Sequence, residues 1–111
     1  MSKHRAVEYV VEPTGYDKLV HSDKHLWTLH VCDRGAGWAV VHIGRCLNKD
    51  GEWEYESIPS ERSDEFLART RWKHADDALK AAHDRVDGWK VNGLTAQEAS
   101  DDVAARLAGA S

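Results

Sequence analysis

The sequence predicts an α+β fold, in which an antiparallel meander sheet of four to five strands carries one packed helix and a C-terminal helix. Three observations support this prediction. Residues 26–56 contain three strand-like runs separated by turn-forming sequences. Residues 75–87 then place apolar side chains at helical spacing. Finally, Thr95 and Glu98 have the spacing of a helix capping box.

Residues typical of β-strands occur in five runs. The runs cover residues 5–12, 26–32, 37–47, 53–57 and 66–72. Asp50 and Gly51 suit a tight turn before the fourth run, because Gly readily adopts a positive φ. Gly44 lies inside the third and most apolar run, where it indicates a bulge or the close approach of another element.

Charge supports the pairing of the last two strands. Alternate positions around the fourth run carry acids, and alternate positions in the fifth carry bases. These residues are Glu52, Glu54, Glu56, Arg69, Arg71 and Lys73. In an antiparallel pair the two rows would lie side by side, where each cross-strand pair of opposite charge contributes about 0.2–1 kcal/mol. The sequence therefore predicts that these two strands are neighbours.

Two helices are predicted after the strands. The first covers residues 75–87, with acids in its first turn and Gly88 at its end. The capping box predicts that the second begins near Ala96 and ends near Leu107. Its apolar stripe, which includes Val103 and Leu107, is thin. Such a helix docks weakly or is completed by a partner.

The 111 residues suffice for one domain. Residues 1–24 are predicted to form an N-terminal strand and a polar connection that is partly mobile, and residues 25–111 a single α+β domain. A composition of 41% hydrophobic and 31% charged residues is that of globular proteins. No apolar run is long enough to cross a bilayer, and the start lacks the apolar segment of a secretion signal. We therefore expect a cytoplasmic protein that does not act at a membrane.

Histidine and cysteine at short spacing raise the question of a metal site or a thiol enzyme. The residues concerned are His30, Cys32, His42 and Cys46. In an unbroken strand, the Cα atoms of His42 and Cys46 would lie about 13 Å apart, too far for two ligands of one Zn²⁺. Neither Cys/His pair lies in a catalytic motif, and no glycine-rich phosphate loop precedes a helix. We therefore expect no enzymatic activity, no catalytic residue, no metal and no cofactor.

Five tryptophans are many for so small a domain. If the helix covers only one face of the sheet, one or two of Trp27, Trp38 and Trp53 would lie on the open face. Exposed tryptophan is typical of protein interfaces. We therefore predict a non-enzymatic protein-interaction module, with Trp38, Trp53, Val103 and Leu107 as candidate contacts. The partner is a protein of unknown identity. A second copy of the chain is one candidate, in which case the protein forms a homodimer.

The alternative is a nucleic-acid-binding protein that uses the basic strand Arg69–Lys73. Arg69, Arg71 and Lys73 would contact phosphates. Two features argue against this alternative. The formal net charge is −4, and the row of glutamates would lie beside the bases and cancel their charge.

Part of the chain resembles a known group of proteins. The stretches concerned are Gly-Trp-Ala-Val-Val-His from Gly37, Asp-Gly-Glu-Trp-Glu-Tyr-Glu from Asp50, Asp-Glu-Phe-Leu-Ala-Arg-Thr-Arg-Trp from Asp64, and Asp-Gly-Trp-Lys-Val-Asn-Gly from Asp87. They resemble small uncharacterised accessory proteins of actinobacterial phages and their hosts. The resemblance implies a viral accessory protein that binds a host protein in the host cytoplasm. It assigns no functional residue.

Overall fold

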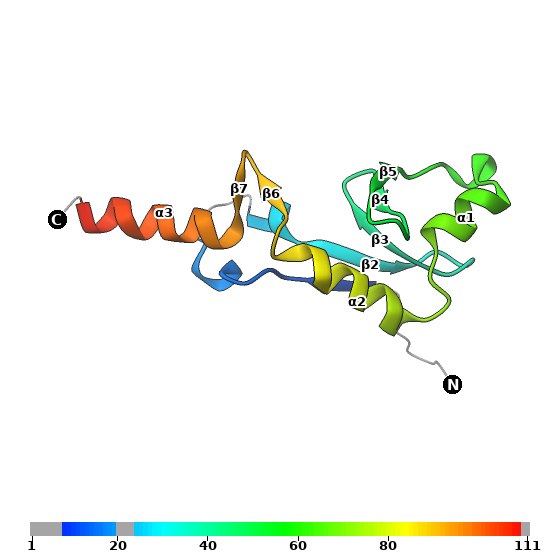
Figure 1. Ribbon diagram of the computed structural model, residues 1–111, viewed down its shortest axis with the longest axis horizontal. Helices are drawn as coiled ribbons and strands as arrows, with labels where there is room; N and C mark the ends of the chain where they lie inside the picture. Colours follow the sequence, from blue (N-terminus) through cyan, green and yellow to red (C-terminus); the bar gives the residue numbers. More distant parts are fainter. Residues whose placement is uncertain (1–7, 20–23, 110–111) are drawn as a thin grey trace, which may run out of the picture.

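The computed structural model describes residues 8–19 and 24–109, apart from the side chains of Pro59, Val103 and Leu107. The fold is α+β, as predicted, with five antiparallel strands paired in chain order in one sheet (Figure 1). The strands are β1 (Glu8–Val11), β2 (Leu29–Asp33), β3 (Trp38–His42), β4 (Arg45–Leu47) and β5 (Trp53–Tyr55). The α-helices are α1 (Asp64–Thr70), α2 (Ala75–Val86) and α3 (Ala96–Gly109). The shorter elements are the 3₁₀ helices η1 (Tyr16–Lys18), η2 (Lys24–Trp27) and η3 (Pro59–Glu61), and the strands β6 (Lys90–Val91) and β7 (Leu94–Thr95).

The main core lies between α2 and one face of the sheet. Helix α2 begins and ends close to the predicted positions, and its small side chains let it approach the strands closely. The buried core residues are Val11, Leu29, Val31, Val40, Leu47, Ala78, Ala82 and Val86. Fully burying one aliphatic side chain contributes about 1.5–3 kcal/mol, so this layer fixes α2 on the sheet.

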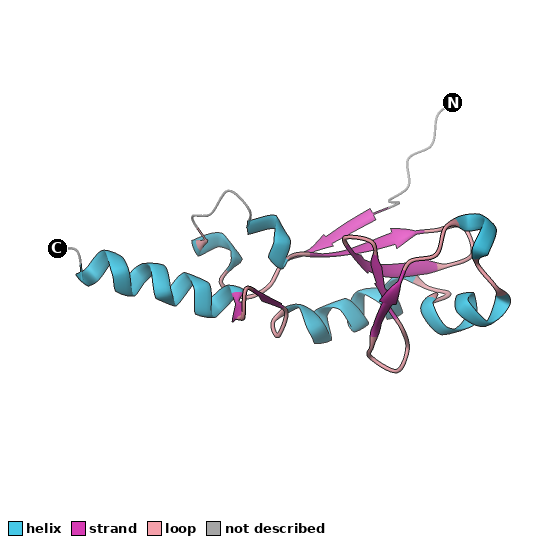
Figure 2. Ribbon diagram, turned by 90° about the horizontal axis from the view of Figure 1, so that it is seen from above, coloured by secondary structure: helices cyan, strands magenta, loops and turns pink. Residues whose placement is uncertain are grey.

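A second, smaller core joins the two ends of the described chain. Leu19 and Trp27 pack there against Ala96 and Ala99 at the start of α3. The indole N–H of Trp27 donates to the carbonyl of Leu94 at 2.9 Å. Beyond this contact α3 extends away from the sheet (Figures 1 and 2).

The predicted capping box is present at the start of α3. The Glu98 amide donates to the Thr95 hydroxyl at 3.2 Å, and the Thr95 amide donates to Glu98 Oε1 at 2.9 Å. Hydrogen bonding of the Glu98 carboxylate to Thr95, chiefly to its backbone amide, lowers the pKa of Glu98. The hairpin of β6 and β7 just before it was not predicted. Asn92 and Gly93 both have positive φ, as a two-residue hairpin turn requires.

The predicted single strand over residues 37–47 is wrong, because the chain reverses within it. Ile43 and Gly44 have φ of 39° and 76° and form a tight turn between β3 and β4. Gly44 therefore lies in a hairpin turn. It forms no bulge, and no other element of the described chain approaches the position that a side chain would occupy. The run predicted at 26–32 also begins later, since its first two residues belong to η2.

The predicted strand over residues 66–72 is also wrong, because most of this segment is the helix α1. Ser63 caps it: its hydroxyl accepts a hydrogen bond from the Phe66 amide at 3.1 Å, and Asp64 and Glu65 lie in the first turn. Only Trp72 joins the sheet, through an isolated bridge to Trp38. The first predicted strand, by contrast, is present as β1, although residues 5–7 lie outside the described residues.

Candidate interaction groove

Two adjoining depressions separate α2 from the turn between β4 and β5. Their volumes are about 480 and 340 Å³, and Gly51, Asp84 and Arg85 line both. The aromatic lining residues are Trp53, Trp72 and Trp89. We call this combined surface the tryptophan groove. Ligand sites in proteins have volumes of about 300–1,000 Å³, so each depression could accept a side chain or a short segment of a partner.

The wall formed by Trp89 and Trp53 is held in place by specific contacts. The Trp89 indole N–H donates to the Leu26 carbonyl at 3.1 Å, and His42 Nε2 donates to the same oxygen at 2.8 Å. The Trp89 ring centroid lies 4.4 Å from that of His42 and 4.9 Å from that of Trp53. Edge-to-face aromatic pairs of this kind contribute about 0.5–1.5 kcal/mol beyond their buried area. This wall is therefore preformed in the free protein.

The turn between β4 and β5 forms the opposite wall and is equally well fixed. Asn48 is 7% exposed, and its Oδ1 accepts hydrogen bonds from the amides of Asp50 and Glu52 at 3.0 and 2.9 Å. The amide of Lys49 donates to the carbonyl of Arg69 at 2.9 Å, which ties the turn to α1. The groove thus lies between two rigid elements.

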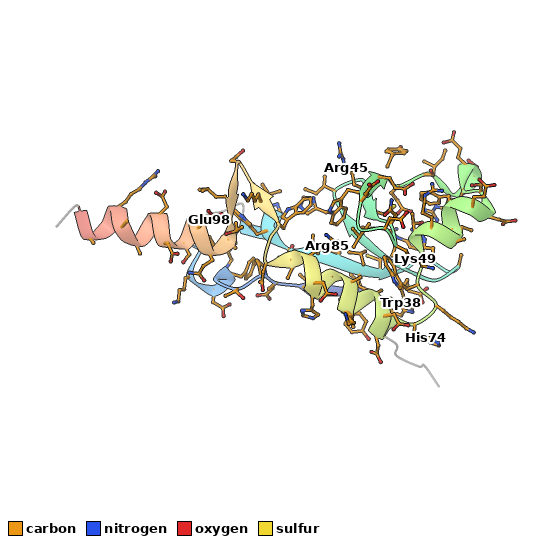
Figure 3. All side chains as sticks on the ribbon, viewed as in Figure 1. Trp38, Arg45, Lys49, His74, Arg85 and Glu98 are labelled. Carbon is orange, nitrogen blue, oxygen red and sulfur yellow. The ribbon has the colours of Figure 1, made fainter. Side chains whose placement is uncertain are left out.

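Arg85 occupies the middle of the tryptophan groove, on the side of α2 that faces the β4–β5 hairpin (Figure 3). Its guanidinium lies directly over Gly51. A Cβ atom added to Gly51, where φ is +87°, would stand 2.9 Å from Arg85 Cζ and overlap Nη2. Among the described residues, none forms an ion pair or hydrogen bond with this guanidinium.

The predicted interaction residues are only partly brought together. Trp53 lines the groove, whereas Trp38 packs against the main core and lies beside Tyr9, with ring centroids 5.7 Å apart. Val103 and Leu107 belong to α3, distant in the fold from the groove, and their side chains lie outside the described residues. The sequence reasoning missed Trp72, Trp89 and Arg85, which only the tertiary fold places at one surface.

The expected open face exists in part, but it carries no tryptophan among the residues described. Trp38 and Trp53 lie on the α2 side of the sheet, as their registers with Asp33 and Leu47 show, and Trp27 is 5% exposed in the second core. The other face has a depression of about 430 Å³. Its lining residues include Glu8, His30, Cys32 and Val41.

The bases proposed for nucleic-acid contact are mostly engaged with acids. Arg69 Nε and Nη2 donate to the two oxygens of Glu54 at 2.8 and 2.7 Å. Arg71 is 4% exposed, and its guanidinium pairs with Glu56. Lys73 is exposed and makes no ion pair within the described part of the chain. The acids and bases do pair as the sequence suggested, but Glu54 of β5 pairs with Arg69 of the helix α1, and Glu56 after β5 pairs with Arg71 after α1.

The histidines and cysteines are dispersed. Among the residues that the structure describes, no three His, Cys, Asp or Glu side chains are placed to hold one metal ion. The turn at Gly44 brings Cys46 beside Val41, while His42 faces the other side of the sheet. Burial, with a smaller contribution from Glu56, raises the pKa of the Cys46 thiol to about 11, and burial also raises that of Cys32. Neither thiol is therefore an activated nucleophile at neutral pH.

Comparison with known proteins found no matching family, no matching curated protein and no matching solved structure. Within the described ranges, no helix has the length and apolar character needed to cross a membrane.

Proposed function

We propose that this protein is a non-enzymatic interaction module that binds a polypeptide segment of a partner protein in the tryptophan groove. The observation that carries the proposal is that tryptophans line both adjoining depressions, Trp72 the larger one and Trp53 and Trp89 the smaller one. Large aromatic side chains that are partly exposed contribute most of the binding energy at many protein interfaces. Both walls are fixed by hydrogen bonds, so little conformational entropy is lost on binding.

The groove also suits a polypeptide better than a catalytic reaction. Its charged lining residues are Lys49, Asp50, Asp77, Lys80, Asp84 and Arg85. Lys80 and Asp84 pair with each other at 3.1 Å. Charges of both signs around aromatic side chains favour the core-and-rim arrangement of a protein interface. The resemblance to phage accessory proteins supports a host protein as the partner, met in the host cytoplasm.

Selection of 12-residue peptides from a random display library tests the proposal. Peptides selected on the wild-type protein should bind an Ala81→Arg variant at least about tenfold more weakly, a loss of about 1.4 kcal/mol. Ala81 lies on α2 and lines the groove, so arginine there would fill it. The matched control is His83→Arg, which adds the same side chain at an exposed position of α2 that does not line the groove.

Binding should be followed by the indole N–H signals of the five tryptophans in ¹H–¹⁵N spectra. Shifts at Trp53, Trp72 and Trp89 that exceed those at Trp27 support the groove as the site. The proposal fails if no peptide is selected, or if the selected peptides bind both variants equally. Sedimentation equilibrium of the free protein separately tests whether a second copy of the chain is the partner.

A further inference from the structure

The strongest single feature of the tryptophan groove is the Arg85 guanidinium, which is exposed and lies over Gly51. Three arginines in and around α1 have carboxylate partners: Arg62 and Arg71 pair with Glu56, and Arg69 pairs with Glu54. Arg85 has none among the described residues, although Asp84 and Asp50 line the same groove. Arg85 is exposed, so an incoming group can reach its guanidinium.

We propose that Arg85 pairs with a carboxylate of the bound polypeptide segment, and that an aromatic side chain next to this carboxylate packs against Trp53 and Trp89. This inference rests on the proposed function of the groove. A guanidinium can donate two parallel hydrogen bonds to a carboxylate, which makes such pairs both strong and directional. The depression of about 340 Å³ that Arg85 shares with both tryptophans provides the apolar surface for the ring.

The surrounding charges favour a carboxylate over a phosphate. One guanidinium balances one negative charge, and the lining as a whole has no positive surplus, because its three bases (Lys49, Lys80, Arg85) are matched by three acids (Asp50, Asp77, Asp84). A phosphate monoester carries a charge of about −1.5 to −2 at neutral pH, so its second charge would find no surplus positive charge in this lining. A nucleic acid or phosphorylated segment is therefore the less favourable occupant.

Four short peptides test this assignment. They are acetyl-Ala-Ala-Phe with a free C-terminal carboxylate, the same peptide amidated, acetyl-Ala-Phe-Glu amide, and acetyl-Ala-Phe-phosphoserine amide. We expect at least one carboxylate peptide to shift the Trp53 and Trp89 indole signals with a Kd about tenfold lower than that of the amidated peptide. Comparison of the peptide with a free C-terminus and the peptide with a Glu side chain shows which of the two carboxylates binds more tightly. Equal affinity of the amidated peptide, or tighter binding of the phosphopeptide, overturns the assignment.

Variants of Arg85 show whether the guanidinium is responsible. Arg85→Gln should remove the tenfold preference for the carboxylate, and Arg85→Lys should keep only part of it, since lysine cannot form the paired hydrogen bonds. Arg45→Gln is the matched control, because Arg45 is an exposed cation on β4 outside the groove (Figure 3). A preference that survives in Arg85→Gln overturns the inference.

The two proposals fail in different ways. If library-selected peptides lose affinity in Ala81→Arg but not in Arg85→Gln, the groove binds polypeptide and Arg85 is not the anchor. If neither substitution weakens their binding, both proposals are overturned together.

Discussion

Arg71 and Glu56 form an ion pair that is almost completely removed from solvent, with side chains 2% and 11% exposed. Arg62 approaches the same carboxylate, with its Nη2 atom 3.3 Å from Glu56 Oε1. Arg71 Nη1 also donates to the Thr70 hydroxyl at 3.2 Å, while its buried Nε has no partner among the described residues. The pair fixes the end of α1 to the segment that follows β5.

Removal of one partner of this pair should be costly. Glu56→Ala should lower the free energy of unfolding by about 3–5 kcal/mol, because it leaves a buried guanidinium without its carboxylate. Glu54→Ala is the matched control, since its partner Arg69 is 42% exposed and such pairs contribute about 1 kcal/mol or less. Urea unfolding followed by tryptophan fluorescence measures both. If the two variants lose equal free energy of unfolding, the buried pair does not contribute more stability than the exposed one.

The Glu54–Arg69 pair should make the protein sensitive to acid. The hydrogen bonds from Arg69, helped by Asn48, lower the pKa of Glu54 below its ordinary value of 4.5. A carboxylate with a lowered pKa stabilises the fold fully above its unfolded value, and this contribution is lost as the pH falls through the folded value. Between pH 7 and pH 3, the urea midpoint should therefore fall further for the wild type than for Glu54→Gln. Glu52→Gln, at an exposed neighbouring position, should follow the wild type.

Gly37 should be more sensitive to an added side chain than the neighbouring Gly35. Its φ is +142°, and an added Cβ would stand 2.8 Å from the carbonyl oxygen of Trp72, which accepts the hydrogen bond of the Trp38 amide at 2.7 Å. Gly35 is the control: its φ is also positive, but nothing lies within 4 Å of an added Cβ. Thermal unfolding should show that Gly37→Ala costs about 1–3 kcal/mol more than Gly35→Ala, the usual range for overpacking. A similar loss of stability in Gly37→Ala and Gly35→Ala would show that backbone strain, and not the contact with Trp72, causes the loss.

The two thiols should differ in reactivity. Cys46 is fully buried with a pKa of about 11, whereas Cys32 is partly exposed. Because the thiolate is the reactive form, an aromatic disulfide reagent at pH 8 should modify Cys32 first. Cys46 should react only at the rate of unfolding, and at full speed in denaturant. Rapid reaction of two thiols in the native protein would contradict the burial of Cys46.

The sequence predicted the elements whose patterns are local and strong. Helix α2, the capping box of α3 and the turn at Gly51 follow from spacing and turn chemistry. The strand prediction for residues 66–72 failed because a short run can satisfy strand alternation and helical spacing at once. Ser63, followed by two acids, was the signal that could have identified α1.

The charge pattern predicted correctly which acidic and basic segments lie together, but it predicted two paired strands where the structure has a strand and a helix. Glu54 does pair with Arg69, and Glu56 with Arg71, but Arg69 lies in α1 and Arg71 directly follows this helix, so no second strand is involved. The tryptophan groove could not be predicted in this way. Trp72, Arg85 and Gly51 are far apart in the chain, and only the packing of α2 beside the β4–β5 turn brings them to one surface.

The second core has a consequence for the order in which the molecule folds. Trp27 and Leu94 are 67 residues apart, Trp89 and Leu26 are 63 apart, and Thr14 and Asp87 are 73 apart, yet each pair is joined by a hydrogen bond. Contacts of such long range form slowly, because a large loop must close first. During synthesis, Leu19 and Trp27 therefore leave the ribosome long before the residues that bury them. The N-terminal segment of the nascent chain keeps an apolar surface exposed until the last quarter of the protein has been made.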